Sequence, residues 1–246
     1  MKAPGFVADW PAPPGVRTWQ TTRQGGVSEG AYRSFNLGLH VGDVPPAVAA
    51  NRARLVEALG LPAEPAWLEQ VHGNRILRLD DGETGSADGA VTSARGTVLA
   101  VMTADCLPVL LATTDGSRIG VAHAGWRGLA AGVLTRAVAA FGREPAELVA
   151  WLGPAIGPAA YEVGDEVRAA IAETDTGALG AFAPNARGRF QLDLYRIARR
   201  QLGQAGVGAI HGGDACTFAD PERYFSHRRE GPCGRMASVI WREALK

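Results

Sequence analysis

Residues 108–128, PVLLATTDGSRIGVAHAGWRG, contain two apolar runs that flank Asp115 and Gly116. An Asp-Gly pair between two apolar runs is a strong signal for a β-hairpin with a two-residue turn. Counting outward from that turn places Pro108 opposite His123, unless a β-bulge shifts the pairing by one residue. We therefore expect two antiparallel strands in this register.

The same register brings a thiol and an imidazole together at the open end of the hairpin. Cys106 lies opposite Gly125, and so beside His123. A helix is expected directly after the turn that follows His123, and the partial positive charge at its N-terminus adds to the effect of the imidazole. Both effects lower the pKa of Cys106, which makes its thiolate a better metal ligand or nucleophile.

His72 is the third candidate ligand. It lies in QVHG, residues 70–73, at the end of another predicted strand, and it shares only this strand-end setting with the other two. A single cysteine in an apolar strand is commonly a small buried hydrophobe, and a single histidine is commonly a hydrogen-bonded loop residue. The pairing of Cys106 with His123 favours a His/Cys/His metal centre instead. No functional role is assigned to three other residues of these types: Cys216, Cys233 and His40.

Two polar loops are candidates for substrate binding, although a segment of this kind, taken alone, is more commonly a solvated loop. SFNLG, residues 34–38, is punctuated by glycine, so that its backbone could approach a ligand closely. SHRREG, residues 226–231, clusters cations that could hold a phosphate or carboxylate. If that segment is extended, Arg229 and His227 face the pocket and Arg228 faces away. The predicted substrate-binding residues are Ser34, Asn36, Arg52, Gln70, Arg127 and Arg229.

Composition bounds the class of protein. The 246 residues, 46% hydrophobic and 20% charged, suffice for a globular domain with a sizeable core, and we expect a single domain over residues 1–246. The 25 basic and 25 acidic residues balance, which gives no electrostatic reason to expect nucleic acid or a membrane as a partner. Residues 1–16 lack the apolar core of a secretion signal, and the three cysteines show no CxxC spacing. A reducing cytoplasm therefore fits best.

Apolar periodicity predicts both strands in hairpins and strands that alternate with helices. Outside the hairpin, strands are expected at residues 16–23, 67–71, 76–79, 97–103, 148–152, 207–211 and 237–241. Helices are expected at residues 45–59, 129–141, 164–172 and 192–205. This mixture indicates an α+β protein, with helices outside one or two packed mixed sheets.

Six motifs in a fixed order resemble one bacterial family. They are RQGGVS (23–28), SFNLG (34–38) with VGD (41–43), QVHG (70–73), AVMTADCLPV (100–109), AHAGWRG (122–128), and FSHRR (225–229) with GRMA (234–237). Together they resemble the YfiH-type family, long labelled laccase-domain or multicopper polyphenol oxidase, over essentially the whole chain. The resemblance implies an α/β/β/α layered fold and a zinc ion held by His72, Cys106 and His123. The chain departs from the family pattern at Cys233, where threonine is expected, but this position lies outside the ligand motifs.

The resemblance also implies a function, because members of the family are described as purine nucleoside phosphorylases with adenosine deaminase activity. Its small-molecule partners would be phosphate and a purine nucleoside: adenosine, inosine, guanosine or methylthioadenosine. Arg52, Arg127 and Arg229 are candidates for phosphate only through the phosphorolysis that the resemblance implies. Two imidazoles and a thiolate leave zinc an open position for water, which suits deamination of adenosine. The five histidines of the chain are too few for a four-copper laccase, which needs about ten imidazoles.

Two alternatives of other classes stay open. The first is a cysteine hydrolase, in which Cys106 is the nucleophile and His123 the base, editing the amide bonds of a peptidoglycan precursor. The second is a metal-binding module without catalytic activity. Protein partners and oligomeric state are not predicted.

Overall fold

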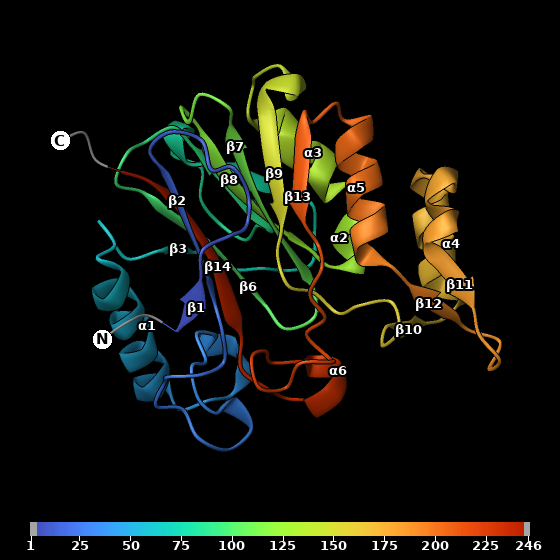
Figure 1. Ribbon diagram of the computed structural model, residues 1–246, viewed down its shortest axis with the longest axis horizontal. Helices are drawn as coiled ribbons and strands as arrows, with labels where there is room; N and C mark the ends of the chain where they lie inside the picture. Colours follow the sequence, from blue (N-terminus) through green and yellow to red (C-terminus); the bar gives the residue numbers. More distant parts are fainter. Residues whose placement is uncertain (1–3, 244–246) are drawn as a thin grey trace.

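The computed structural model describes residues 4–243, whose strands form two packed sheets and a small third one (Figure 1). The first sheet has the order β1-β2-β14-β6-β3: Gly5–Phe6 (β1), Val16–Thr21 (β2), Met236–Arg242 (β14), Val98–Thr103 (β6) and Ala66–Trp67 (β3). The second has the order β13-β9-β7-β8-β5-β4: Ala209–Gly212 (β13), Leu148–Leu152 (β9), Leu107–Thr113 (β7), Ile119–Ala124 (β8), Gly89–Thr92 (β5) and Ile76–Arg78 (β4). The third pairs Glu162–Val163 (β10) and Phe182–Pro184 (β11) with Phe190–Leu192 (β12).

Helices cover the outer faces of the two large sheets (Figure 1). Helix α1, Pro45–Leu59, lies on the first sheet, where Leu55 packs in a cluster with Val98 and Val239. The helices on the second sheet are Trp126–Ala130 (α2), Val133–Ala140 (α3) and Leu194–Gln204 (α5), and the remaining ones are Asp165–Thr174 (α4) and His227–Glu230 (α6). Short 3-10 turns span Gly30–Tyr32, Leu39–Val41, Leu79–Asp81, Pro145–Glu147 and Thr176–Ala181. The expected α+β fold with α/β/β/α layers is confirmed.

The sheets are mixed, as expected. Strands β3 and β6, β4 and β5, and β9 and β13 pair in parallel, whereas the other pairs are antiparallel. In the described part of the chain, no helix is both long and apolar enough to cross a membrane.

The β7–β8 hairpin forms in the expected register, with Pro108 opposite His123. Gly116 in the turn has φ 68°, a left-handed conformation that glycine adopts without strain. Both faces of β7 are buried: Val109 packs toward the helices and Leu110 toward the first sheet. Two-sided burial explains the unbroken apolar sequence of this strand. On β8, His123 shares a face with Val121, which packs between the sheets.

Three local expectations were wrong. Of the expected strand at residues 67–71, only Trp67 pairs with a neighbour, as the last residue of β3, because the chain then turns through the loop that carries His72. The expected helix at residues 129–141 is two helices, broken where Gly132 adopts φ 76°. Residues 227–230 form the short helix α6 instead of an extended segment, with the Ser226 side chain accepting from Arg229 N–H. Strand β5 and the third sheet were not expected.

Candidate metal centre

Three side chains converge where β8 ends and β7 begins. Their ligand atoms, on His72, Cys106 and His123, all lie within 4.8 Å of one another. The Cys106 Sγ atom is 3.9 Å from His72 Nε2, and the two imidazole rings meet edge to face with centroids 4.8 Å apart. His123 is buried, Cys106 is half-buried and His72 is exposed, so that the cluster is open to solvent on one side. The hairpin register therefore accounts for two of the three residues, and folding brings in the third.

Asp88 holds both histidine-bearing segments in place. This carboxylate is fully buried at the start of β5, and it accepts the backbone N–H groups of Val71, His72 and Gly73 at 3.3, 2.9 and 2.6 Å. Its Oδ1 atom is also 2.8 Å from His123 Nδ1. Burial alone would raise the pKa of Asp88, but the hydrogen bonds from His123 and Gly73 hold it below its ordinary value. With Nδ1 occupied, His123 presents Nε2 to the cluster, as in carboxylate–histidine–metal arrangements.

The backbone is strained on both sides of the thiol. His72 (φ 59°) and Asp105 (φ 88°) are the non-glycine residues of the described chain with left-handed backbone, a conformation that clusters at functional sites. The side chain of Asp105 accepts the Thr217 hydroxyl at 2.6 Å and the Arg228 backbone N–H at 2.7 Å. These bonds fix the bend that aims Cys106 at the histidines.

Gly125 has no side chain, and this absence makes room for the side chains of Cys106 and His72. A Cβ atom at this position would lie 2.9 Å from Cys106 Sγ and 3.2 Å from His72 Cδ2. Both distances are shorter than ordinary van der Waals contacts, so any larger residue would displace a candidate ligand. The site thus requires the glycine that precedes helix α2.

Cys106 and His123 form a thiolate–imidazolium pair in the absence of metal. Burial alone would disfavour charge on either group. The charge of His123 and hydrogen bonds from both histidines nevertheless lower the pKa of Cys106 to about 6. In turn, the thiolate and Asp88 raise the pKa of His123 to about 9. The thiol is therefore ionised at neutral pH, which is the state that a metal ligand or nucleophile requires.

The donor set fits zinc. Bonds of about 2.3 Å to sulfur and 2.1 Å to nitrogen in a tetrahedron put sulfur and nitrogen about 3.6 Å apart, close to the 3.9 Å between Cys106 Sγ and His72 Nε2. Two imidazoles and one thiolate also match a site that keeps a fourth position for water or substrate. The donor set is far smaller than the one that a multicopper centre needs, and the whole chain has five histidines.

Sequence reasoning did not predict a role for five residues beside the centre: Asp88, His40, Arg235, Tyr161 and Arg228. The pKa of His40 is lowered by burial and then by the positive charges of Arg235 and Arg52. Burial and the neighbouring Cys106 raise the pKa of Tyr161, whose ring is covered by the Arg228 guanidinium at 5.1 Å. The sequence did offer a signal for Arg235, which lies in the GRMA motif. The other four residues reach the centre only through long-range folding.

Among the predicted substrate-binding residues, Gln70 and Arg52 lie near the centre. The Gln70 amide bonds both backbone groups of Met102, at the end of β6, at 2.8 Å. Arg52 stacks on Trp67 at 4.1 Å and donates to the Leu37 carbonyl. Arg127 is exposed and stacks on Trp126.

The structure does not bring Ser34, Asn36 and Arg229 to the centre as ligand-binding groups. The Ser34 hydroxyl bonds Gly26 N–H and the Arg23 carbonyl. Asn36 is fully buried and bonds Asp43. Arg229 donates to the carbonyls of Thr217, Phe218 and Tyr224 and to Glu230, all at 2.7 Å, and His227 is exposed. The expected extended conformation of this segment is wrong, because residues 227–230 form α6; substrate binding by Arg229 stays a prediction.

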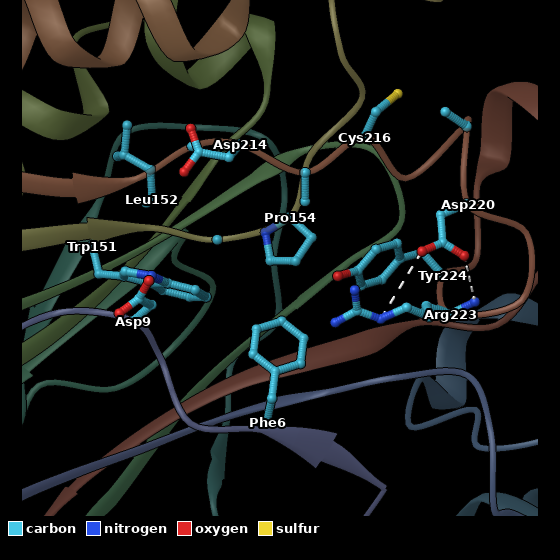
Figure 2. Close-up of a pocket in the computed structure, with 15 residues that line it drawn as sticks. Phe6, Asp9, Trp151, Leu152, Pro154, Asp214, Cys216, Asp220, Arg223 and Tyr224 are labelled. Atoms are coloured by element: carbon cyan, nitrogen blue, oxygen red, sulfur yellow. Dashed lines mark hydrogen bonds and ion pairs between the residues drawn. The ribbon is translucent and has the colours of Figure 1, made fainter.

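A cavity of about 560 Å³ opens where β9 and β13 end. Figure 2 shows Phe6, Pro154 and Tyr224 facing one another across it. Asp9, Asp214 and Asp220 supply carboxylates, and its cysteine is Cys216. None of the three candidate metal ligands lines this cavity, so it is distinct from the metal centre.

Comparison with known proteins assigns the chain to a family. The family model described as multi-copper polyphenol oxidoreductase laccase matches residues 17–243. A Xylella fastidiosa protein named purine nucleoside phosphorylase is 54% identical over 249 residues, covering 96% of each chain. The Escherichia coli protein named purine nucleoside phosphorylase YfiH is 50% identical and covers 96% of this chain and 98% of its own. A crystal structure of a Neisseria meningitidis protein superposes with a TM-score of 0.93 at 47% identity, covering 98% of this chain and 99% of that chain. The chain therefore belongs to the laccase-like YfiH family.

Proposed function

We propose that the chain is a zinc-dependent purine nucleoside phosphorylase that also deaminates adenosine. The observation that carries the proposal is the His72/Cys106/His123 cluster, held by Asp88, in a chain about half identical to proteins named purine nucleoside phosphorylase. Adenosine, inosine, guanosine and methylthioadenosine are the proposed nucleosides.

In phosphorolysis, a phosphate oxygen bonds to ribose C1′ while the C1′–N9 bond breaks. The bonding electrons leave with the purine, which takes up a proton, and ribose 1-phosphate is the second product. In deamination, water replaces the 6-amino group of adenosine, giving inosine and ammonia. Bound zinc would supply a Lewis acid that activates water near neutral pH.

The residues of the chain would position these groups. Asp88 keeps Nε2 of His123 directed at the centre, and the strained backbone at Asp105 aims the Cys106 thiolate. Tyr161, whose pKa is raised by burial and by Cys106, stays protonated at neutral pH. Its hydroxyl is therefore free to donate a hydrogen bond to the leaving purine beside the centre.

A cysteine hydrolase is the second candidate, because the Cys106–His123 ion pair is also the arrangement of an activated thiol nucleophile. His72 argues for the metal, since a hydrolase of this kind needs one imidazole base and this cluster has two imidazoles.

The experiment that tests the proposal supplies inosine with and without phosphate, and adenosine without phosphate, to zinc-loaded protein. We expect hypoxanthine and ribose 1-phosphate only when phosphate is present, inosine from adenosine in either case, and loss of both reactions after chelation. Hydrolysis of a peptidoglycan precursor that survives chelation, with no reaction of nucleosides, would favour the cysteine hydrolase. No turnover of either substrate would favour a binding module.

A further inference from the structure

Two arginines from distant parts of the chain grip the same loop beside the centre. Arg52 of α1 donates to the Leu37 carbonyl through Nε and Nη2 at 3.0 and 2.8 Å. The Arg235 carbonyl accepts the N–H of Leu37 at 3.1 Å, and the side-chain carbons of Arg235 lie against Gly38. His40 follows in the same loop. Two guanidinium groups and an imidazole are thereby gathered around one short segment.

Neither guanidinium group forms an ion pair within the described residues, although the charge of Glu64 raises the pKa of Arg52 against the effect of burial. Within residues 4–243, no carboxylate oxygen lies within 4.0 Å of Arg52 or Arg235, although both side chains are half-buried. Arg23 and Arg229, which are comparably buried, share Glu230 as a counter-ion. Gathering half-buried cations without an anion costs free energy that a bound anion would recover.

The group lies next to the metal centre. Arg52 Nη2 is 3.9 Å from Met102 Sδ, and the backbone of Met102 is bonded by Gln70, two residues before His72. Four residues after Met102 the chain reaches Cys106. His40 is near the same arginines, because burial and then the charges of Arg235 and Arg52 lower its pKa. A ligand held by the arginines would therefore lie beside a substrate at the centre.

We propose that Arg52, Arg235 and His40 form the subsite that binds inorganic phosphate, an inference that rests on the phosphorolysis proposed above. Backbone carbonyls hold both guanidinium groups: the Leu37 carbonyl accepts from Nε and Nη2 of Arg52, and the Cys233 and Gly234 carbonyls accept from Nη1 of Arg235. The remaining N–H groups are pre-oriented, which suits the fork-like contacts that arginine makes with phosphate. Phosphate held here would present an oxygen to ribose C1′ while the purine departs with the bonding electrons.

Arg228 and Arg127 form a second pair of cations, which is the alternative location for phosphate. Arg228 donates to the Glu162 carbonyl and stacks on Tyr161, and Arg127 stacks on Trp126. Both guanidinium groups are thus placed against aromatic rings. Arg52 also stacks on an aromatic ring, that of Trp67, so stacking does not separate the two locations, and the Arg228→Gln variant in the test does.

The test combines direct binding of inorganic phosphate to zinc-loaded protein with the KM for phosphate in inosine phosphorolysis. Arg235→Gln and His40→Gln should each weaken phosphate binding and raise this KM about tenfold or more, with the zinc content unchanged. Arg235→Lys should recover part of the loss, since it restores the charge without the fork. His40 is exposed, so its replacement tests the subsite even if the arginine variants fold poorly. Arg143→Gln, exposed at the turn end of the hairpin, is the matched control.

The outcomes separate this inference from the proposed function. If the wild-type protein binds phosphate but does not cleave inosine, the proposed function fails and the subsite stands. If wild-type protein does not bind phosphate, or binds it no better than the Arg235→Gln and His40→Gln variants, the subsite is wrong. An increase in KM for phosphate confined to Arg228→Gln would place phosphate against Tyr161 instead and also overturn the inference.

Discussion

Replacing Asp88 by asparagine tests whether this carboxylate positions the metal ligands. The change keeps the size of the side chain but replaces one acceptor oxygen by an NH2 donor. If the remaining oxygen stays on His72 N–H and His123 Nδ1, the new NH2 faces the N–H groups of Val71 and Gly73, which Oδ2 accepts at 3.3 and 2.6 Å. Both of those donors then lose their acceptor inside a fully buried site.

The size of the effect follows from these contacts. A buried donor without an acceptor costs about 1–3 kcal/mol, so the two together should lower the free energy of unfolding by about 2–6 kcal/mol. Loss of a carboxylate that orients a metal-binding histidine weakens metal binding by about 10- to 100-fold. This is about 1.4–2.7 kcal/mol of binding free energy.

The zinc Kd is measured by competition with a chromophoric chelator, and unfolding is followed in urea with and without zinc. Asp80→Asn is the matched control, since Asp80 also accepts several hydrogen bonds, from Thr92 and Ser93, but touches none of the candidate ligands. We expect Asp80→Asn to leave the zinc Kd unchanged. Equal zinc affinities in Asp88→Asn and wild-type protein would rule out a positioning role for Asp88, whatever happens to stability.

Three further predictions concern the site and its surroundings. In metal-free protein, the rate of Cys106 alkylation should rise with pH through a midpoint near pH 6, because the thiolate forms above its lowered pKa. His123→Gln should move that midpoint toward about pH 8.5. A wild-type midpoint already near 8.5 would contradict the ion pair. Gly125→Ala should weaken zinc binding about tenfold or more, because its Cβ would lie 2.9 Å from Cys106 Sγ. The control Gly203→Ala, whose Cβ meets nothing within 4 Å, should leave the zinc Kd unchanged. Equal zinc Kd values for Gly125→Ala and the wild-type protein would show that the site relaxes around the methyl group. Arg229→Gln should lower the Tm, because three carbonyls lose their donor, and should leave the KM for phosphate unchanged; a raised KM with an unchanged Tm would restore the sequence-based assignment.

The parts of the fold that sequence could predict are those with local causes. The β7–β8 register follows from Asp115-Gly116 and two apolar runs, and this register alone is enough to place Cys106 beside His123. Helix α1 ends where Gly60 takes φ 57°, and Asp193 caps α5 by accepting from Arg196 N–H. These signals lie within a few residues of the feature that they determine.

The parts that sequence missed depend on distant partners. Asp88 lies 35 residues before His123 in the chain, and nothing near it in the sequence distinguishes it from other acidic loop residues. The alternation that assigned Arg229 to the pocket failed because the Ser226 side chain caps a short helix. His40 and Arg235 become neighbours of the centre only when the first sheet packs against the second.

Whether His72, Cys106 and His123 hold zinc is decided most simply by the metal content of protein purified without added metal, for wild type and for Cys106→Ala. We expect about one zinc per chain in the wild-type protein and less than about a tenth in the variant, because a two-imidazole remnant holds zinc poorly. Less than about a tenth of a zinc in the wild-type protein, or the same zinc content in Cys106→Ala, would contradict the assignment of this metal centre.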